Sequence, residues 1–139
     1  MKKLALTDFT KYRYPSALEL SPDGRYLTFA LKEVDREGDG YRWNLWLYDL
    51  ESRESRQITR GDHQRQAVWE DNTHILYKTT EPDEAMRARG FEEEWTVYHR
   101  LNVCTGEERE AFRLPMSVSG LWKMDEGRYV FTGETHLDR

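Results

Sequence analysis

The stretch Leu18-Glu19-Leu20-Ser21-Pro22-Asp23-Gly24-Arg25-Tyr26-Leu27-Thr28-Phe29 decides the fold, because it predicts two strands joined by a tight turn. Pro22 presets φ at one turn position, and Gly24 supplies the positive φ that the turn needs. The outline recurs at 67–77, where Asn72 replaces Gly24 and is expected to adopt positive φ, and again at 120–131. This recurrence predicts three related units along the chain.

A second strand–turn–strand pattern follows each of the first two units. In the first unit, residues 45–54 predict a strand and a turn, and residues 57–59 the strand that follows. In the second unit, residues 99–107 and 112–114 are their counterparts. Each complete unit therefore holds four short strands, and Asp71 follows Asp23 by 48 positions. Four strands in about 40–50 residues are typical of one blade of a β-propeller. Residues 45–50 are apolar at nearly every position, which indicates a sheet covered on both faces.

The predicted fold class is therefore all-β, a partial β-propeller with about two and a half four-stranded antiparallel blades. Blade one is expected at about 15–60, blade two at about 64–115 and a partial blade three at 116–139, with a turn of helix at 7–13 before the first strand. Propellers close with about four to eight blades. The 139 residues are accordingly expected to be the N-terminal fragment of a larger propeller, with the missing part C-terminal.

Composition excludes several classes of protein. Aromatic residues make up 13% of the chain, which argues against disorder. The net charge of −5 without a basic cluster makes nucleic acid an unsuitable partner, and no apolar run is long enough to span a membrane. The apolar stretch near the start ends after three residues, too short for a secretory signal, and Cys104 has no second cysteine to pair with. These features predict a cytoplasmic protein.

The segments 14–30, 44–50 and 57–59 together resemble the first propeller blade of prolyl oligopeptidase family serine peptidases, especially the acylaminoacyl-peptidase-like branch. The opening Asp8-Phe9-Thr10-Lys11-Tyr12 and the run Arg87-Ala88-Arg89-Gly90-Phe91 are similar to segments of the same branch. The resemblance implies a propeller that gates and positions short or N-acylated peptides for a downstream α/β-hydrolase domain with a Ser-Asp-His triad. None of the six serines lies in the G-x-S-x-G context of a nucleophile elbow, so the catalytic residues are expected outside this chain, which should be inactive alone.

Two alternatives remain open on the sequence. The Ser-Pro-Asp-Gly turn also occurs in TolB-like and WD-type propellers, which would make the protein a module that only binds protein partners. A free-standing small domain built from the same strands is the third alternative.

Substrate-binding residues are predicted in the second of two long loops, at about 33–42 and 80–94, which are expected to share one face of the propeller. The candidates are Arg87, Arg89, Glu92 and Glu93. The acidic run is similar to the glutamate pair with which dipeptidyl-peptidase relatives hold a free α-amino group by charge-assisted hydrogen bonds. The alternative is an ordinary solvated charged loop.

No cofactor or metal site is predicted. The run 35–40 opens like a calcium loop, but Trp46 stands where the loop needs a glutamate, and the four histidines are scattered. Cys104 is expected to be a partly buried thiol. Trp69 and Trp122 stand at similar repeat positions and are expected in the core between blades. Because truncation would uncover blade faces and strand edges, the chain alone is expected to self-associate.

Overall fold

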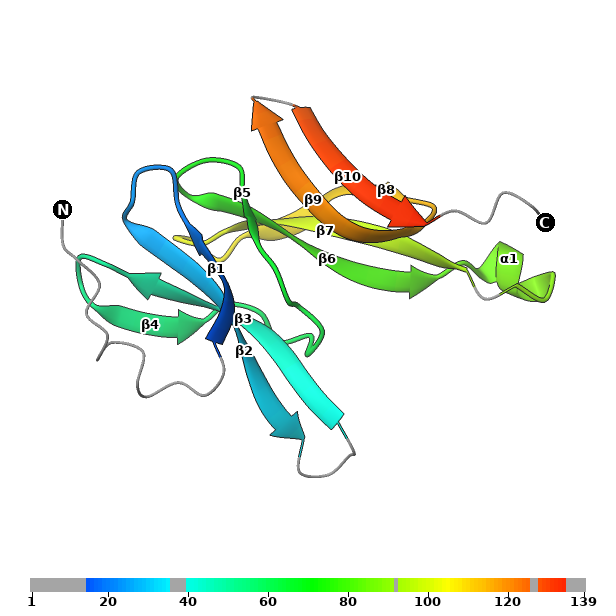
Figure 1. Cartoon of the computed structure of the whole chain (residues 1–139), viewed down its shortest axis with the longest axis horizontal. Coiled ribbons are helices and arrows are strands. Elements are labelled where there is room, and N and C mark those ends of the chain that lie inside the picture. Colours follow the sequence, from blue (N-terminus) through cyan, green and yellow to red (C-terminus); the bar gives the residue numbers. More distant parts are fainter. Residues whose placement is uncertain (1–14, 36–39, 92, 126–127, 135–139) are drawn as a thin grey trace.

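Three antiparallel sheets follow one another along the chain in the computed structural model, which describes residues 15–35, 40–91, 93–125 and 128–134 (Figure 1). The first sheet contains, in order, β1 (Pro15–Leu20), β2 (Tyr26–Asp35), β3 (Gly40–Asp49) and β4 (Glu54–Gln57). The second contains β5 (Val68–Trp69), β6 (His74–Pro82), β7 (Glu94–Asn102) and β8 (Glu108–Leu114), with the short helix α1 (Glu84–Ala88) between β6 and β7. The third contains β9 (Ser117–Asp125) and β10 (Arg128–Glu134).

The predicted turn between β1 and β2 is confirmed. Gly24 has a φ of 75°, and its N–H donates to the carbonyl of Ser21 over 2.9 Å. The Ser21 hydroxyl donates to Asp23 over 2.7 Å and accepts from the N–H of Tyr26 over 3.0 Å. The Ser-Pro-Asp-Gly run thus closes the turn with both main-chain and side-chain bonds.

The equivalent turn between β5 and β6 is built differently. Asn72 was expected at positive φ and is not among the residues that adopt it. Here the carboxylate of Asp71 accepts the main-chain N–H groups of Thr73 and His74, each over 2.8 Å. An aspartate that bonds main-chain groups two and three residues ahead closes a turn without any residue in the left-handed region.

The first and second sheets pack face to face through a shared apolar core. The indole of Trp69 stacks on the ring of Tyr26 at 6.3 Å between centroids, and its N–H donates to the carbonyl of Glu19 over 3.1 Å. Around this pair lie buried residues of both sheets, among them Ala30, Leu45, Leu47, Ala67, Ile75, Leu101 and Val103. The opposite face of the first sheet buries a second cluster, Leu27, Phe29, Leu31, Tyr48 and Leu50. The prediction that residues 45–50 are covered on both faces is therefore confirmed.

The second sheet presents its other face to β9 and β10. Leu76 and Tyr98 pack there against Val118 and Leu121. Thr96 of β7 binds the segment that leads into β9. Its buried hydroxyl donates to the carbonyl of Met116 over 2.6 Å and accepts from the N–H of Val118 over 3.1 Å. The second sheet is thus covered on both faces, one by the first sheet and one by the third.

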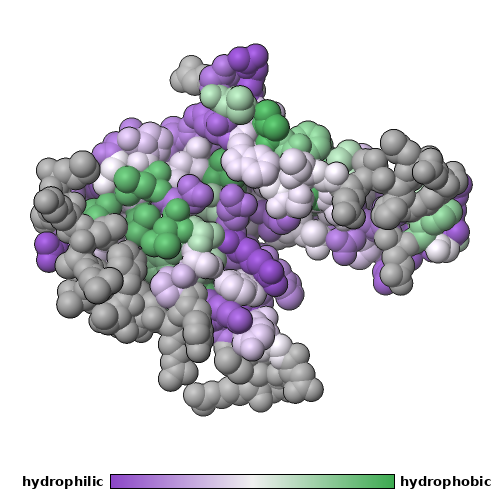
Figure 2. Space-filling view, viewed as in Figure 1, coloured by the Kyte–Doolittle hydropathy of each residue, from purple (hydrophilic) through white to green (hydrophobic). Residues whose placement is uncertain are grey.

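The prediction for Trp122 is wrong, because its side chain is 48% exposed on the outward face of β9. The cause is the register of β9 against β10. Ser119 has no partner opposite it, so the alternation of faces shifts by one, and Val118 and Leu121 both point at the second sheet. Trp122 then points away from it, and Figure 2 shows hydrophobic surface in the upper part of the molecule, where Figure 1 places β9 and β10.

The described residues establish an all-β fold of antiparallel sheets, and they form no closed barrel or propeller. The two segments expected as long loops are mostly regular structure. The ladder of β2 with β3 extends to Asp35 opposite Gly40, and β6 continues to Pro82. The helical turn expected at 7–13 lies outside the described residues.

Candidate functional site

The predicted substrate-binding loop is a capped helical turn at the end of the β6–β7 hairpin. Asp83 caps α1, since its carboxylate accepts the N–H of Met86 over 3.1 Å. Its own N–H donates to the carbonyl of Glu93 over 2.9 Å, which closes the loop, and Gly90 leaves the helix with a φ of 89°. Sequence reasoning missed α1, although an aspartate before Glu84 and a glycine after the turn were available signals.

The structure brings three of the four candidate side chains to this turn. Arg87 lies in α1, 66% exposed, with its guanidinium 3.7 Å from the carboxylate of Glu84. Arg89 ends the helix and places its guanidinium 5.8 Å from the ring centroid of Phe91. Glu93 is half-buried beside them, and Glu92 lies outside the described residues.

The other predicted loop is a strand hairpin with its own cross-strand contacts. Glu33 and Arg42 form an ion pair of 3.7 Å, and the ammonium of Lys32 lies 3.7 Å from the ring centroid of Tyr41. In Figure 1 this hairpin points to the bottom and α1 lies at the right. The expectation that both loops share one face of a propeller stays a prediction.

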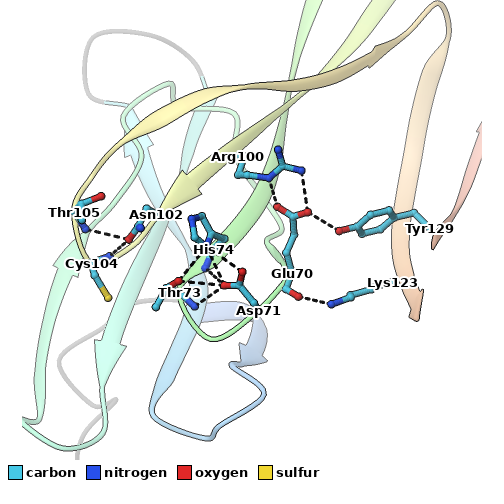
Figure 3. A network of polar contacts seen from close by, with 10 residues as sticks. All are labelled: Glu70, Asp71, Thr73, His74, Arg100, Asn102, Cys104, Thr105, Lys123 and Tyr129. Atoms are coloured by element: carbon cyan, nitrogen blue, oxygen red, sulfur yellow. Dashed lines mark hydrogen bonds and ion pairs between the residues drawn. The ribbon is translucent and has the colours of Figure 1, made fainter. Parts of the chain in front are cut away.

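A polar network centred on Glu70 connects the second sheet to the third (Figure 3). Arg100 on β7 binds the Glu70 carboxylate with two nitrogens, at 2.5 and 3.0 Å, and the Tyr129 hydroxyl on β10 donates to it over 2.7 Å. Lys123 on β9 donates to the main-chain carbonyl of the same residue. Sequence reasoning did not single out Glu70, because its partners are 30 to 59 residues away along the chain.

The network keeps Glu70 ionised. Burial is the largest influence on the carboxyl and favours its neutral form, but the hydrogen bonds from Arg100 and Tyr129 outweigh it and lower the pKa of Glu70. Burial and the bond to Glu70 together raise the pKa of Tyr129, so the phenol stays a donor. The site is a structural ion pair within the second sheet, with hydrogen bonds from Tyr129 and Lys123 that tie it to the third, and its pKa shifts keep Glu70 charged and Tyr129 protonated near neutral pH.

Asp71, Thr73 and His74 contain the residue types of a catalytic triad in the wrong arrangement. The Thr73 hydroxyl and the Asp71 carboxylate both lie 3.0 Å from the same nitrogen of His74, Nδ1. A nucleophile and an orienting acid must contact opposite ring nitrogens, so that the base can take a proton from one while the other is held. This cluster therefore closes a turn and cannot activate a nucleophile.

Two serines, one further histidine and the cysteine have contacts within the fold. The hydroxyls of Ser21 and Ser119 contact Asp23 and Thr132 respectively. His99 on β7 lies 2.8 Å from the hydroxyl of Thr79, and burial lowers its pKa. Cys104 was expected to be partly buried and is exposed in the turn after β7, with its sulfur 3.5 Å from the Tyr26 hydroxyl.

Among the residues that the structure describes, no three histidine, cysteine, aspartate or glutamate side chains gather as a metal site would require. Across the same part of the chain, no helix has the length and apolar character needed to cross a membrane. The calcium-like run at 35–40 lies largely outside the described residues.

No protein-family model matches the chain, and no curated protein is significantly similar to it.

Proposed function

We propose that this chain is the N-terminal part of the β-propeller of a prolyl oligopeptidase family serine peptidase, in which it gates and positions short or N-acylated peptides for a downstream Ser-Asp-His domain. The observation that carries the proposal is the serial stacking of meander sheets. Two sheets of four consecutive antiparallel strands pack face to face, and the second offers its free face to the next two strands. Blades of a propeller are built and packed in this way.

The turn chemistry supports the same assignment. The Ser-Pro-Asp-Gly turn that carries the sequence resemblance is formed with Gly24 at positive φ and Ser21 buried beneath it. In the proposed enzyme, further blades would complete the propeller around a central opening. Access through that opening would admit short peptides and exclude folded proteins, so selectivity would come from exclusion as well as from contacts.

The helical turn at α1 is the proposed contact region for substrate. Arg87 and Arg89 are exposed there, so two cations are presented to solvent in the segment from the cap Asp83 to Gly90, and Glu93 follows in the same loop. Arg87 already pairs with Glu84, and an exposed pair of this kind separates at little cost. A peptide carboxylate could therefore take the place of Glu84.

The test is expression of the complete reading frame that contains this chain, followed by labelling with a fluorophosphonate that reacts with activated serines. We expect one labelled serine in a G-x-S-x-G context, hydrolysis of N-acetylated short peptides and no cleavage of folded proteins. Alanine at the labelled serine should abolish hydrolysis. A reading frame that encodes only further strand repeats, with no labelled serine, would refute the peptidase and favour a TolB-like or WD-type binding propeller.

A further inference from the structure

A cavity of about 370 Å³ lies between the segment 63–66, the β9-facing side of the second sheet and β9 itself. Its polar lining includes His63, Arg65, Lys78, Tyr98 and Ser119. No aspartate or glutamate lines it among the described residues. A chain with 26 acidic and 21 basic residues has thus formed one hollow whose charged side chains are all basic.

Lys78 is the most enclosed of these basic groups. Its side chain leaves β6 directly opposite Tyr98 of β7, and its ammonium donates to the main-chain carbonyl of Val118 on β9. No carboxylate pairs with it in the described part of the chain. Burial, followed by repulsion from Arg65, lowers the pKa of Lys78, so the protein surroundings disfavour the charge that Lys78 carries.

Arg65 is held at the mouth by a fixed segment. The N–H of Trp43 donates to the carbonyl of Asp62 over 2.9 Å, and the N–H of Gln64 donates back to Trp43 over 3.0 Å. The guanidinium of Arg65 lies 4.9 Å from the ring centroid of Trp43, and no carboxylate of the described residues pairs with it. Its five donors therefore remain available to a ligand.

Tyr98 also lines the cavity and brings a phenol hydroxyl to it. Only 3% of the residue is exposed, and its ring packs on Phe112 at 5.0 Å between centroids. Burial raises the pKa of Tyr98 to about 12, so the phenol keeps its proton and can donate it in a hydrogen bond. The hydroxyl oxygen is not one of the fully buried polar atoms that lack a partner among the described residues, so it stays accessible to water or to an anion that enters the cavity.

We propose that this cavity is a binding site for a small oxyanion, a carboxylate or a phosphate, held by Arg65, Lys78 and Tyr98. An anion there would offset the repulsion between the two cations and accept the hydrogen bond of the phenol. The volume lies at the lower end of the range typical of small-molecule sites, which suits a compact anionic group. The site is independent of the peptidase function and does not involve α1.

A larger cavity between the first and second sheets serves as an internal comparison. It has about 570 Å³ and is lined by Arg56 and Glu108 among others. There Arg56 already donates to the carbonyl of Val103, and Glu108 accepts from the Tyr77 hydroxyl. That cavity also contains Arg60, but it differs from the first in that a carboxylate, Glu108, lies among its basic side chains.

The test is titration of the full chain with inorganic phosphate, with succinate and with a short peptide carrying either a free or an amidated C-terminus. Binding is followed by calorimetry and by amide chemical shifts. We expect at least one anion to bind with a dissociation constant in the millimolar range or tighter, with shifts confined to 63–66, 78, 98 and 118–121. Preference for the free over the amidated peptide would identify a carboxylate as the ligand, and preference for phosphate would identify a phosphorylated one.

Matched variants give the proposal its sharpest test. Arg65→Gln, which alters an exposed residue, should weaken binding about tenfold or more, Lys78→Met should do so at least as strongly, and Tyr98→Phe should weaken it severalfold. Arg53→Gln removes the same charge from an exposed turn of the first sheet and should leave affinity unchanged. Absence of binding by every probe, or equal losses in Arg53→Gln and Arg65→Gln, would overturn the site.

Discussion

Replacing Glu70 with alanine should loosen the third sheet from the second without disturbing the first. The carboxylate is 15% exposed and accepts two bonds from Arg100 and one from the Tyr129 hydroxyl. Of these, only the bond from Tyr129 crosses to β10, so its loss is the part felt by the third sheet. The bond from Lys123 goes to the main chain of residue 70 and would survive the substitution.

The free-energy change caused by Glu70→Ala depends on how exposed Arg100 and Tyr129 are. Hydrogen bonds to charged groups contribute about 1.5–3 kcal/mol when one partner is removed. The Arg100 side chain is 36% exposed and can bind water after the substitution, so the loss of its bonds to Glu70 adds little to the free-energy change. The Tyr129 link is then worth about 1.5 kcal/mol, which corresponds to roughly a tenfold change in the equilibrium for local opening.

Hydrogen–deuterium exchange is the suitable assay because it resolves local opening. Glu70→Ala should accelerate exchange in peptides from 117–134 about tenfold while peptides from 26–49 keep their rates. Tyr129→Phe, which removes the hydroxyl alone, should reproduce most of this acceleration. Glu110→Gln breaks an exposed ion pair on β8 and should change neither region. Unaltered exchange across 117–134 in Glu70→Ala, or equal acceleration in both regions, would refute the reasoning.

Two further predictions concern association and acid. The double substitution Trp122→Ser and Val130→Thr should reduce the self-association expected for this chain, because both residues are 48% exposed on one face of β9–β10. Sedimentation velocity measures the change. The control Tyr41→Ser, at a residue of β3 that is 57% exposed, should leave self-association unaltered. Partial burial opposes ionisation of Asp71, but hydrogen bonds from the turn lower its pKa from 3.8 to about 2. The ionised Asp71 therefore contributes fully to the free energy of unfolding above about pH 4, and the contribution is lost as the pH falls toward 2. Asp71→Asn should flatten the dependence of the free energy of unfolding on pH between those values. An unchanged slope in this acid range would contradict the prediction.

Local turn chemistry made most of the strand order predictable. Gly24 and Gly106 both adopt positive φ, as the Ser-Pro-Asp-Gly and Thr-Gly runs indicate. Alternation and apolar density then placed the strands on either side. The prediction of positive φ at Asn72 was wrong because a short turn can be closed in two ways. A residue at positive φ is one, and the side chain of Asp71 bonding the main chain is the other, and the sequence contains both.

Contacts between sheets were less predictable. Repeat alignment places Trp122 with Trp69, yet Trp69 is 7% exposed and Trp122 is 48% exposed. A single unpaired residue, Ser119, reverses the faces of β9 beyond it, and no local composition marks it. Glu70 and Lys78 escaped sequence reasoning for a related reason, since their significance depends on partners brought near by the stacking of sheets.

The two interfaces of the second sheet differ in chemistry. Toward the first sheet the contact is mainly aromatic and aliphatic, centred on Trp69 stacked over Tyr26. Toward β9 and β10 a smaller apolar cluster is accompanied by the Glu70 network and by the basic cavity. Polar bonds that exchange with water contribute less per contact than apolar burial does. The third sheet should therefore open first, and any anion that bridges Lys78 and Arg65 would bind where the fold is most easily moved.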